Sequence, residues 1–308
     1  MSWGMSGARR GSIAGGAVVL VGGSGRVGRM VRHHWPGPAR LLSSHRDPAP
    51  SERGFVWSPL AGPTGLLDHL AQDGATPSAL VMLAGVVPGP GQDAAALQAN
   101  ARLARACLAA ARAAGIARVL LASSSAVYGT QAHGLPFAEA DPPQPLSAYG
   151  RAKLEMETEA DSFRQAGMQV CALRIGNVAG ADALLAPLSA SLLNPDAPRA
   201  PIQLHAFADG LGPLRSYIGA ASLALVLARL ADPATPLPPV LNIAAPEPLR
   251  MAALAKAADW PCQMIPAPPA AHQSITLDCT HLAALCPSVV KGNDPAAMVA
   301  EWKATLPR

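Results

Sequence analysis

The chain has 308 residues, half of them hydrophobic and 14% charged, so it can bury a large core and is not intrinsically disordered. Its formal net charge is +4, without a block of like charge and without an apolar run long enough to span a membrane, so we expect neither a nucleic-acid partner nor a membrane segment. Five cysteines, an odd number without C-x-x-C spacing, argue against a disulfide framework or a zinc site; we expect no metal and a cytoplasmic location.

The first half of the chain alternates short apolar runs with helical stretches. We predict strands at Ala17–Val21, Arg40–Ser43, Gly54–Trp57, Leu80–Ala84, Val119–Ser123 and Gln169–Arg174. We predict helices at Arg26–His34, Leu66–Gln72, Ala94–Ala114 and Ala148–Gly167. This alternation is typical of an α/β fold, namely a Rossmann-type doubly wound parallel sheet with helices on both faces.

The chain divides into three predicted parts. Residues 1–14 form a flexible N-terminal tail, and residues 15–176 form the Rossmann domain. Proline-rich stretches then break the pattern, so residues 177–308 form a smaller lobe that is partly interleaved with the Rossmann domain. Within this lobe we predict helices at Ala220–Leu230 and Met251–Ala258.

A glycine-rich turn links the first predicted strand to the first predicted helix. Gly22, Gly25 and Gly28 have the spacing G-x-x-G-x-x-G. Glycine permits a tight turn and a close approach of a pyrophosphate, which the N–H groups at the helix start then bind. We therefore predict a dinucleotide-binding turn rather than a plain tight turn. Its cofactor ligands are Gly22, Ser24, Gly25, Arg26, Val27 and Gly28.

The residues after the second predicted strand distinguish NAD from NADP. An acidic residue at this place holds the ribose 2′-hydroxyl of NAD. The chain instead has Ser43-Ser44-His45-Arg46 before Asp47, and Ser44 with Arg46 suits a 2′-phosphate. We predict NAD(P) with a slight preference for NADP. The alternative is a solvated loop in which Asp47 holds the ribose.

Tyr149 and Lys153 are four residues apart at the start of a predicted helix and so share one of its faces. A phenol has an ordinary pKa near 10, and a neighbouring ammonium lowers it toward the range of a general base. The alternative is a surface tyrosine beside an exposed lysine.

Ser124 directly follows another predicted strand, where a hydroxyl can orient a reacting carbonyl or alkoxide. The alternative is that the serine cluster there only stabilises a turn.

Together these residues resemble the extended short-chain dehydrogenase/reductase family, in its NAD-dependent epimerase/dehydratase branch. The resemblance runs from Val18 to about Leu285. It implies that residues 15–176 bind NAD(P), that residues 177–308 bind substrate, and that Asn100 matches an Asn of the family's long helix. It also implies roles for single residues. Ser124, Tyr149 and Lys153 are catalytic, and Tyr149 and Lys153 also bind the cofactor, with Lys153 at the nicotinamide ribose. Ala84 and Gly85 lie beside the same ribose. Ser124, Ser125 and Asn177 contact the substrate, and Arg215 binds its diphosphate.

The chain departs from the family pattern at several places. Ser125 and Ala126 stand where sugar dehydratases carry an Asp-Glu pair, which disfavours dehydration. Ser216 replaces the Asp of the motif R-D-Y-I, Ala179 replaces the Tyr of N-V-Y-G, and Ser58 stands where an Asp near the adenine is common.

The resemblance implies an NAD(P)-dependent epimerase or reductase that acts on a secondary alcohol or ketone, with a nucleotide sugar as the expected substrate. Two alternatives stay open: an NADPH-dependent ketone or aldehyde reductase with a non-sugar substrate, and a non-catalytic NAD(P)-sensing regulator. Similar enzymes pair their two long helices across a two-fold axis, which implies a homodimer through Ala94–Ala114 and Ala148–Gly167.

Overall fold

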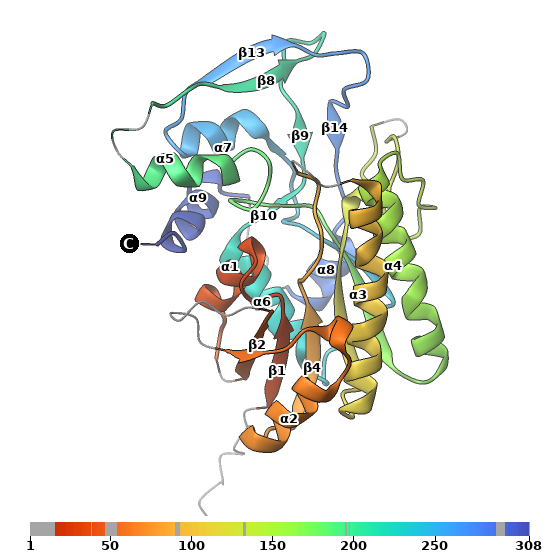
Figure 1. Cartoon of the computed structure of the whole chain (residues 1–308). Helices are drawn as coiled ribbons and strands as arrows, with labels where there is room; N and C mark the ends of the chain where they lie inside the picture. The colour runs from red at the N-terminus through yellow and green to blue at the C-terminus, as the bar shows by residue number, and fades with distance from the viewer. Residues whose placement is uncertain are drawn as a thin grey trace, which may run out of the picture.

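The computed structural model describes residues 16–37, 39–46, 54–89, 93–131, 134–194, 196, 198–287 and 293–307. The predicted tail at residues 1–14, and Asp47, lie outside the described residues. The described chain forms an α/β sandwich with a smaller lobe above one end of its sheet, as Figure 1 shows.

The central sheet has seven strands, and every neighbouring pair is parallel. Its order is β3 (Phe55–Val56), β2 (Arg40–His45), β1 (Ala17–Val21), β4 (Pro77–Met82), β5 (Arg118–Ser124), β6 (Gln169–Ile175) and β11 (Val240–Ile243). The strand order reverses between β1 and β4, and in open parallel sheets such a switch point opens a crevice at the carboxyl ends of the strands.

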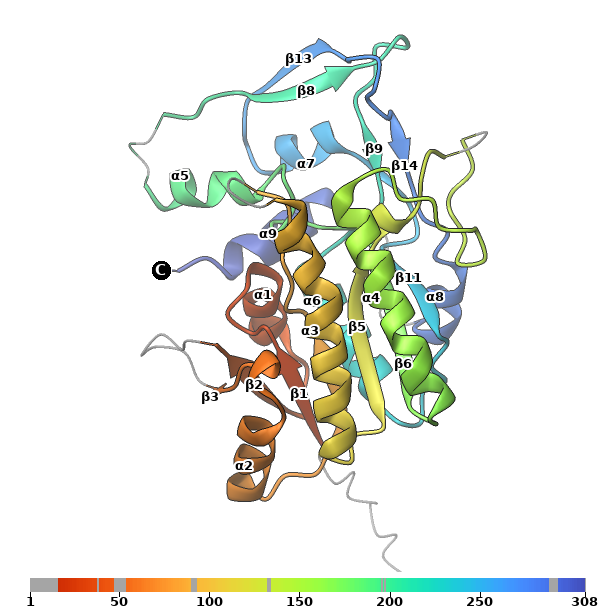
Figure 2. The same ribbon diagram turned by 45° about the vertical axis from the view of Figure 1, so that its right-hand side comes forward.

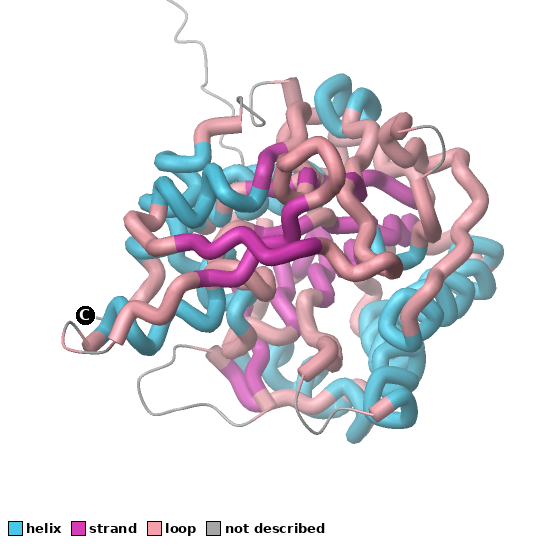
Figure 3. The backbone as a smooth tube through the Cα atoms, turned by 90° about the horizontal axis from the view of Figure 1, so that it is seen from above, coloured by secondary structure: helices cyan, strands magenta, loops and turns pink. Residues whose placement is uncertain are grey.

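Helices cover both faces of this sheet, so the predicted doubly wound fold is confirmed. One face carries α2 (Thr64–Asp73), α3 (Ala94–Ala113) and α4 (Ala148–Gln165), and the other carries α1 (Arg26–His34) and α6 (Ala220–Ala231) (Figure 2). Alternate residues of β1 serve the two cores, since Val18 and Leu20 pack toward α1 and Val19 packs toward α3. Seen from above, the strands run through the middle of the molecule between helices (Figure 3).

The strand predicted over Leu80–Ala84 ends two residues early. β4 stops at Met82 because the N–H groups of Leu83 and Ala84 both donate to the carbonyl of Val21, each at 2.9 Å, and so leave the regular ladder. The strand predicted over Gly54–Trp57 shortens to Phe55–Val56, while helix α2 is longer than predicted at both ends.

The C-terminal half is interleaved with the sheet and also builds the smaller lobe. It supplies β11 and α6 to the Rossmann domain, and α8 (Thr280–Leu285) packs on β11. The lobe contains two small groups of strands and three helices. They are β8 (Ile202–Ala206) with β13 (Cys262–Pro266); β9 (Leu214–Arg215) with β12 (Leu249–Arg250) and β14 (Ser274–Ile275); and α5 (Ser189–Leu193), α7 (Met251–Ala257) and α9 (Pro295–Ala304). Between lobe and sheet, β7 (Asn177–Val178) pairs with β10 (Tyr217–Ile218).

Candidate active site

The glycine turn lies between β1 and α1, at the switch point of the sheet. Gly22 has φ 91°, and a Cβ there would lie 2.5 Å from the backbone nitrogen of Ala84. A Cβ on Gly28 would lie 2.1 Å from the carbonyl oxygen of Gly22. Gly25 is the N-cap of α1, and no side chain caps the N–H groups of the helix start. The turn therefore needs glycine at Gly22 and Gly28 for packing, and at Gly25 it leaves the helix N-terminus open to an anion.

The segment after β4 forms the floor of the site. The Asn100 side chain on α3 holds it, because Oδ1 accepts from the Val86 N–H at 2.8 Å and Nδ2 donates to the Val86 carbonyl at 2.9 Å. A Cβ on Gly85 would lie 2.7 Å from Asn100 Oδ1 and 3.4 Å from Lys153 Nζ. Glycine at this position thus lets the floor approach both the buried amide and the lysine.

Ser124, Tyr149 and Lys153 come together at the carboxyl end of β5. The Tyr149 hydroxyl hydrogen-bonds to Ser124, and Lys153 Nζ lies 5.8 Å from the centre of the Tyr149 ring. Lys153 Nζ also donates to the Ala122 carbonyl at 2.7 Å. Helix α4 begins at Ala148, and the Ser147 side chain caps it by accepting from a backbone N–H. The helix therefore presents Tyr149 and Lys153 on one face toward β5.

Burial sets the protonation states of this group. It raises the pKa of Tyr149, and the hydrogen bond with Ser124 opposes that rise. Burial also lowers the pKa of Lys153 to about 8, against the opposing charge of Glu157. Near neutral pH the site consequently holds a neutral phenol beside a mostly charged ammonium, an arrangement that can exchange a proton with a bound oxygen.

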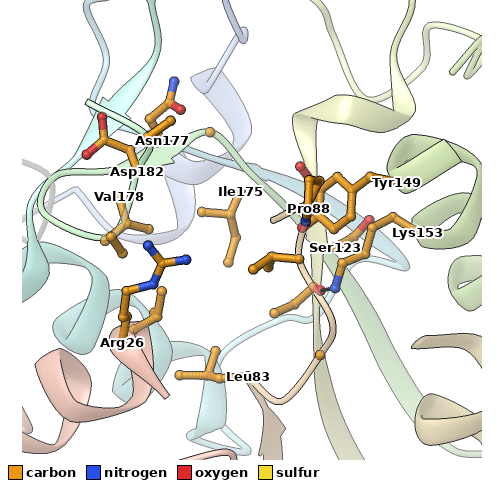
Figure 4. Close-up of a pocket in the computed structure, with 18 residues that line it drawn as sticks. Arg26, Leu83, Pro88, Ser123, Tyr149, Lys153, Ile175, Asn177, Val178 and Asp182 are labelled. Carbon is orange, nitrogen blue, oxygen red and sulfur yellow. Dashed lines mark hydrogen bonds between the residues drawn. The ribbon is translucent and has the colours of Figure 1, made fainter. Parts of the chain in front are cut away.

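A pocket of about 450 Å³ joins the glycine turn to this group. In Figure 4, Tyr149 and Lys153 lie on one side, Arg26 and Leu83 lie on the opposite side, and Asn177 lies above. Arg26 is the first residue of α1 and is exposed. The predicted site residues that line the pocket are Arg26, Val27, Gly85, Ser124, Tyr149, Lys153 and Asn177.

The other predicted site residues lie outside this lining, and three have particular surroundings. The Ser44 hydroxyl is buried and lies 3.3 Å from the Leu20 carbonyl, to which it donates. Arg46 is exposed and directly follows β2. The Arg215 guanidinium donates to three backbone carbonyls, those of Leu214 at 2.8 Å, Gln273 at 2.9 Å and His272 at 2.7 Å. Remaining outside the lining are Gly22, Ser24, Gly25, Gly28, Ala84 and Ser125.

Asp182 lines the pocket but was not among the predicted site residues. Its carboxylate accepts from the Tyr217 hydroxyl at 2.8 Å and from three backbone N–H groups of its own loop. Burial raises the pKa of Asp182, and these hydrogen bonds oppose the rise. A single acidic residue in an irregular segment does not stand out in a sequence. The one signal for Asp182 was its position shortly after the motif Asn177-Val178.

Metal clusters and membrane-spanning helices are both absent from the described residues. No group of three or more His, Cys, Asp or Glu side chains there could hold a metal ion. No helix of the described chain is long and apolar enough to cross a membrane.

The fold is shared by solved structures of enzymes in complex with NAD. MoeE5, in complex with UDP-glucuronic acid and NAD, is 24% identical, covers 94% of this chain and 99% of its own, and has a TM-score of 0.72. The Bordetella bronchiseptica enzyme WbmG in complex with NAD is 21% identical over 96% of this chain and 95% of its own, with a TM-score of 0.72. The UDP-glucose 4-epimerase of Thermus thermophilus with NAD is 21% identical over 93% and 99%, with a TM-score of 0.70.

A family model gives the identification that these distant structures cannot give. No curated protein matches the chain. The model described as the NAD dependent epimerase/dehydratase family matches residues 18–192, which is more than half of the chain and includes both the glycine turn and the Ser124, Tyr149 and Lys153 group. The chain therefore belongs to the NAD dependent epimerase/dehydratase family.

Proposed function

We propose that the protein is an NAD(P)-dependent epimerase or reductase that acts on a secondary alcohol or ketone of a nucleotide sugar. The observation that carries this proposal is the pocket in which Ser124, Tyr149 and Lys153 face the glycine turn. Relatives of the same fold are complexed with NAD and, in MoeE5, with UDP-glucuronic acid.

The residues present suit a nicotinamide dinucleotide. The glycine turn contains Gly22 and Gly28, at which a Cβ atom would clash with backbone atoms. The turn leads into the N-terminus of α1, a position at which pyrophosphate groups bind in dinucleotide-binding folds. Arg26 adds a cation at that end, and Gly85 leaves room beside Lys153. When bound, the nicotinamide would supply the hydride acceptor or donor for the reaction.

The proton chemistry falls to three side chains. Tyr149 takes or gives the proton of the reacting hydroxyl, and Ser124 hydrogen-bonds the same oxygen and orients it. The Lys153 ammonium, 5.8 Å from the centre of the Tyr149 ring, favours the negative charge that the tyrosine oxygen gains during proton transfer, and it donates hydrogen bonds inside the cofactor site. Ser125 and Ala126, next to Ser124, offer no acid pair for eliminating water, so epimerisation or reduction is favoured over dehydration.

Turnover and cofactor binding by the wild type and Tyr149→Phe test this function. The two proteins are incubated with UDP- and dTDP-hexoses or the corresponding ketosugars, with NAD or NADPH, and products are followed by NMR. We expect the variant to bind cofactor normally, because the ring remains, but to lose activity by about 100-fold or more, since proton transfer is worth that much. Unchanged turnover in Tyr149→Phe would remove its catalytic role.

The preference for NADP stays a proposal, and it rests on Arg46. This exposed arginine directly follows β2, where a 2′-phosphate would lie, and the alternative ligand Asp47 is outside the described residues. We expect Arg46→Ala to weaken NADPH binding by about tenfold, the loss of one charge-assisted contact, while NADH binding holds. An equal effect on both cofactors would leave NAD as the better choice.

One observation favours a second candidate function, a ketone or aldehyde reductase with a non-sugar substrate. The Arg215 guanidinium, expected to grip a diphosphate, is engaged by three carbonyls and lies outside the pocket lining. Reduction of simple ketones with NADPH, in the absence of any nucleotide-sugar turnover, would select this function.

The proposed homodimer through α3 and α4 is tested by sedimentation, where a monomer at micromolar concentration would refute it.

A further inference from the structure

The buried carboxylate of Glu157 lies on the same face of α4 as Lys153. Glu157 follows Lys153 by one helical turn on α4 and is 6% exposed. Its Oε1 accepts from the Ser123 hydroxyl at 2.5 Å, and both carboxylate oxygens accept from Arg174 of β6, the shortest contact being 2.8 Å from Nη2. A salt bridge this deeply buried is costly to desolvate, so stability alone is a weak reason for it.

The same two helix residues fasten α4 to consecutive positions of β5. Lys153 Nζ binds the Ala122 carbonyl and Glu157 binds the Ser123 side chain, immediately before Ser124. The helix face that carries Tyr149 and Lys153 thus continues into Glu157. Glu157 and Lys153 together hold the end of β5 that leads into Ser124.

We propose that Glu157 is a positioning residue of the active site: its carboxylate, fixed by Arg174 and Ser123, keeps Lys153 charged and aligned with Tyr149. The proposal rests on the proposed function for its catalytic meaning. Lys153 is 4% exposed, so water does little to stabilise its charge. The negative charge of Glu157 is the interaction that opposes this burial.

The other groups around Lys153 and Glu157 do not supply this anion. On the side of β5, Ser123, Ser124 and the Ala122 carbonyl are neutral, and from α3 the Asn100 amide is neutral. On the side of β6, Arg174 is cationic, and burial raises the pKa of the Cys171 thiol to about 12. On α4 itself, Tyr149 is a phenol whose pKa is raised. Beyond Arg174, the Tyr128 ring lies under its guanidinium and the Glu139 backbone carbonyl accepts from it at 3.4 Å. Of these groups, Glu157 is the anion whose charge acts on Lys153.

Titration of Lys153 by NMR tests the proposal without any substrate. The chain has four lysines, so a protein labelled at lysine Cε gives few signals, and Lys153→Met identifies the relevant one. We expect Glu157→Gln, which keeps the shape, to lower the measured pKa of Lys153 by about one pH unit or more. Glu155→Gln is the matched control, since Glu155 is exposed on the same helix, and it should leave the titration in place.

Removal of Glu157 alone leaves Arg174 buried without its anion and endangers folding. The double variant Glu157→Gln/Arg174→Met removes both charges and keeps the volume, and we expect it too to lower the pKa of Lys153. Glu157→Asp, which retains the charge, should restore the titration in part. If the pKa of Lys153 stays at the wild-type value in Glu157→Gln and in Glu157→Gln/Arg174→Met, with both variants folded, the proposal is overturned and the Glu157–Arg174 ion pair has only a structural role.

Turnover supplies a second readout if the proposed function holds. Because Lys153 must be charged, the alkaline limb of the pH–rate profile should move to lower pH in Glu157→Gln by the amount seen in the NMR titration. A merely structural role would lower the rate equally at every pH. If no nucleotide sugar is turned over, the proposed function fails, whereas the lysine titration still decides the role of Glu157.

Discussion

Lys153 carries a stability cost that should be measurable. The pKa of Lys153 is about 8 in the folded protein, whereas the ordinary value of 10.5 applies to the unfolded chain. Between pH 8 and pH 10.5 the unfolded chain therefore binds the proton more strongly than the folded protein does. At 1.36 kcal/mol per pH unit, the difference corresponds to roughly 3 kcal/mol of destabilisation when the lysine is charged in both states. The group is almost fully buried, so solvent screening reduces this little.

The sign follows from the linkage. Below pH of about 8 the lysine is protonated in both states and the full cost is present; as pH rises toward 10.5 the folded state is already neutral and the cost disappears. Lys153→Met should therefore abolish activity yet stabilise the fold near neutral pH, by about 2 kcal/mol once the lost hydrogen bond to Ala122 is subtracted. This stabilisation should shrink by roughly 2 kcal/mol between pH 7 and pH 10.

Urea unfolding of the wild type and Lys153→Met at the two pH values gives the quantity needed, because other titrating groups cancel in the difference between the proteins. Lys256→Met is the matched control, since Lys256 is exposed and its substitution should have the same effect at both pH values. A stability difference between wild type and Lys153→Met that is identical at pH 7 and pH 10 would refute the reasoning.

Two arginines give further predictions. Arg26→Ala should weaken binding of either nicotinamide cofactor by about tenfold, since it removes an exposed cation from the pyrophosphate end of the pocket; fluorescence titration measures this, and an unchanged Kd would contradict it. Arg215→Ala should lower the free energy of unfolding by about 1–3 kcal/mol, because three carbonyls lose their donor, and should leave the KM for a nucleotide sugar within about twofold. A KM increase of tenfold or more with unchanged stability would return Arg215 to a diphosphate-binding role.

The fold was predictable because its signals are local. Most strands of the Rossmann half are short apolar runs, and helices alternate with them along the chain, which implies parallel strands. The C-terminal end of β4 was not predictable, because Leu83 and Ala84 leave the ladder to share the Val21 carbonyl, a contact between segments distant in sequence. The β8–β13 ribbon was missed because proline-rich flanks obscure its two strands.

The residues of the candidate site likewise fall into two groups, those with a local sequence signal and those that depend on tertiary contacts. The common face of Tyr149 and Lys153 could be predicted because helix geometry fixes it, and the glycine turn could be predicted from the spacing of its glycines. Glu157 lies at the next position of that face, yet its meaning depends on Arg174 and Ser123, which arrive from two strands. A charged residue on a predicted helix is ordinarily solvated, so only the tertiary structure distinguishes it.

Arg215 shows why a motif match predicts a backbone position better than a side-chain role. The apolar part of its motif behaves as expected, since Tyr217 and Ile218 are buried and pair with β7 at Asn177-Val178. The destination of the guanidinium is decided elsewhere, by β14 and the residues before it, which run beside β9 and present the carbonyls of 272 and 273. These carbonyls are neutral acceptors that take three of the five N–H groups of the arginine, so a diphosphate would have to compete with them for Nη1 and Nη2. Among the residues that line the pocket, Arg26 is the exposed cation, and it lies on the side opposite Tyr149 and Lys153.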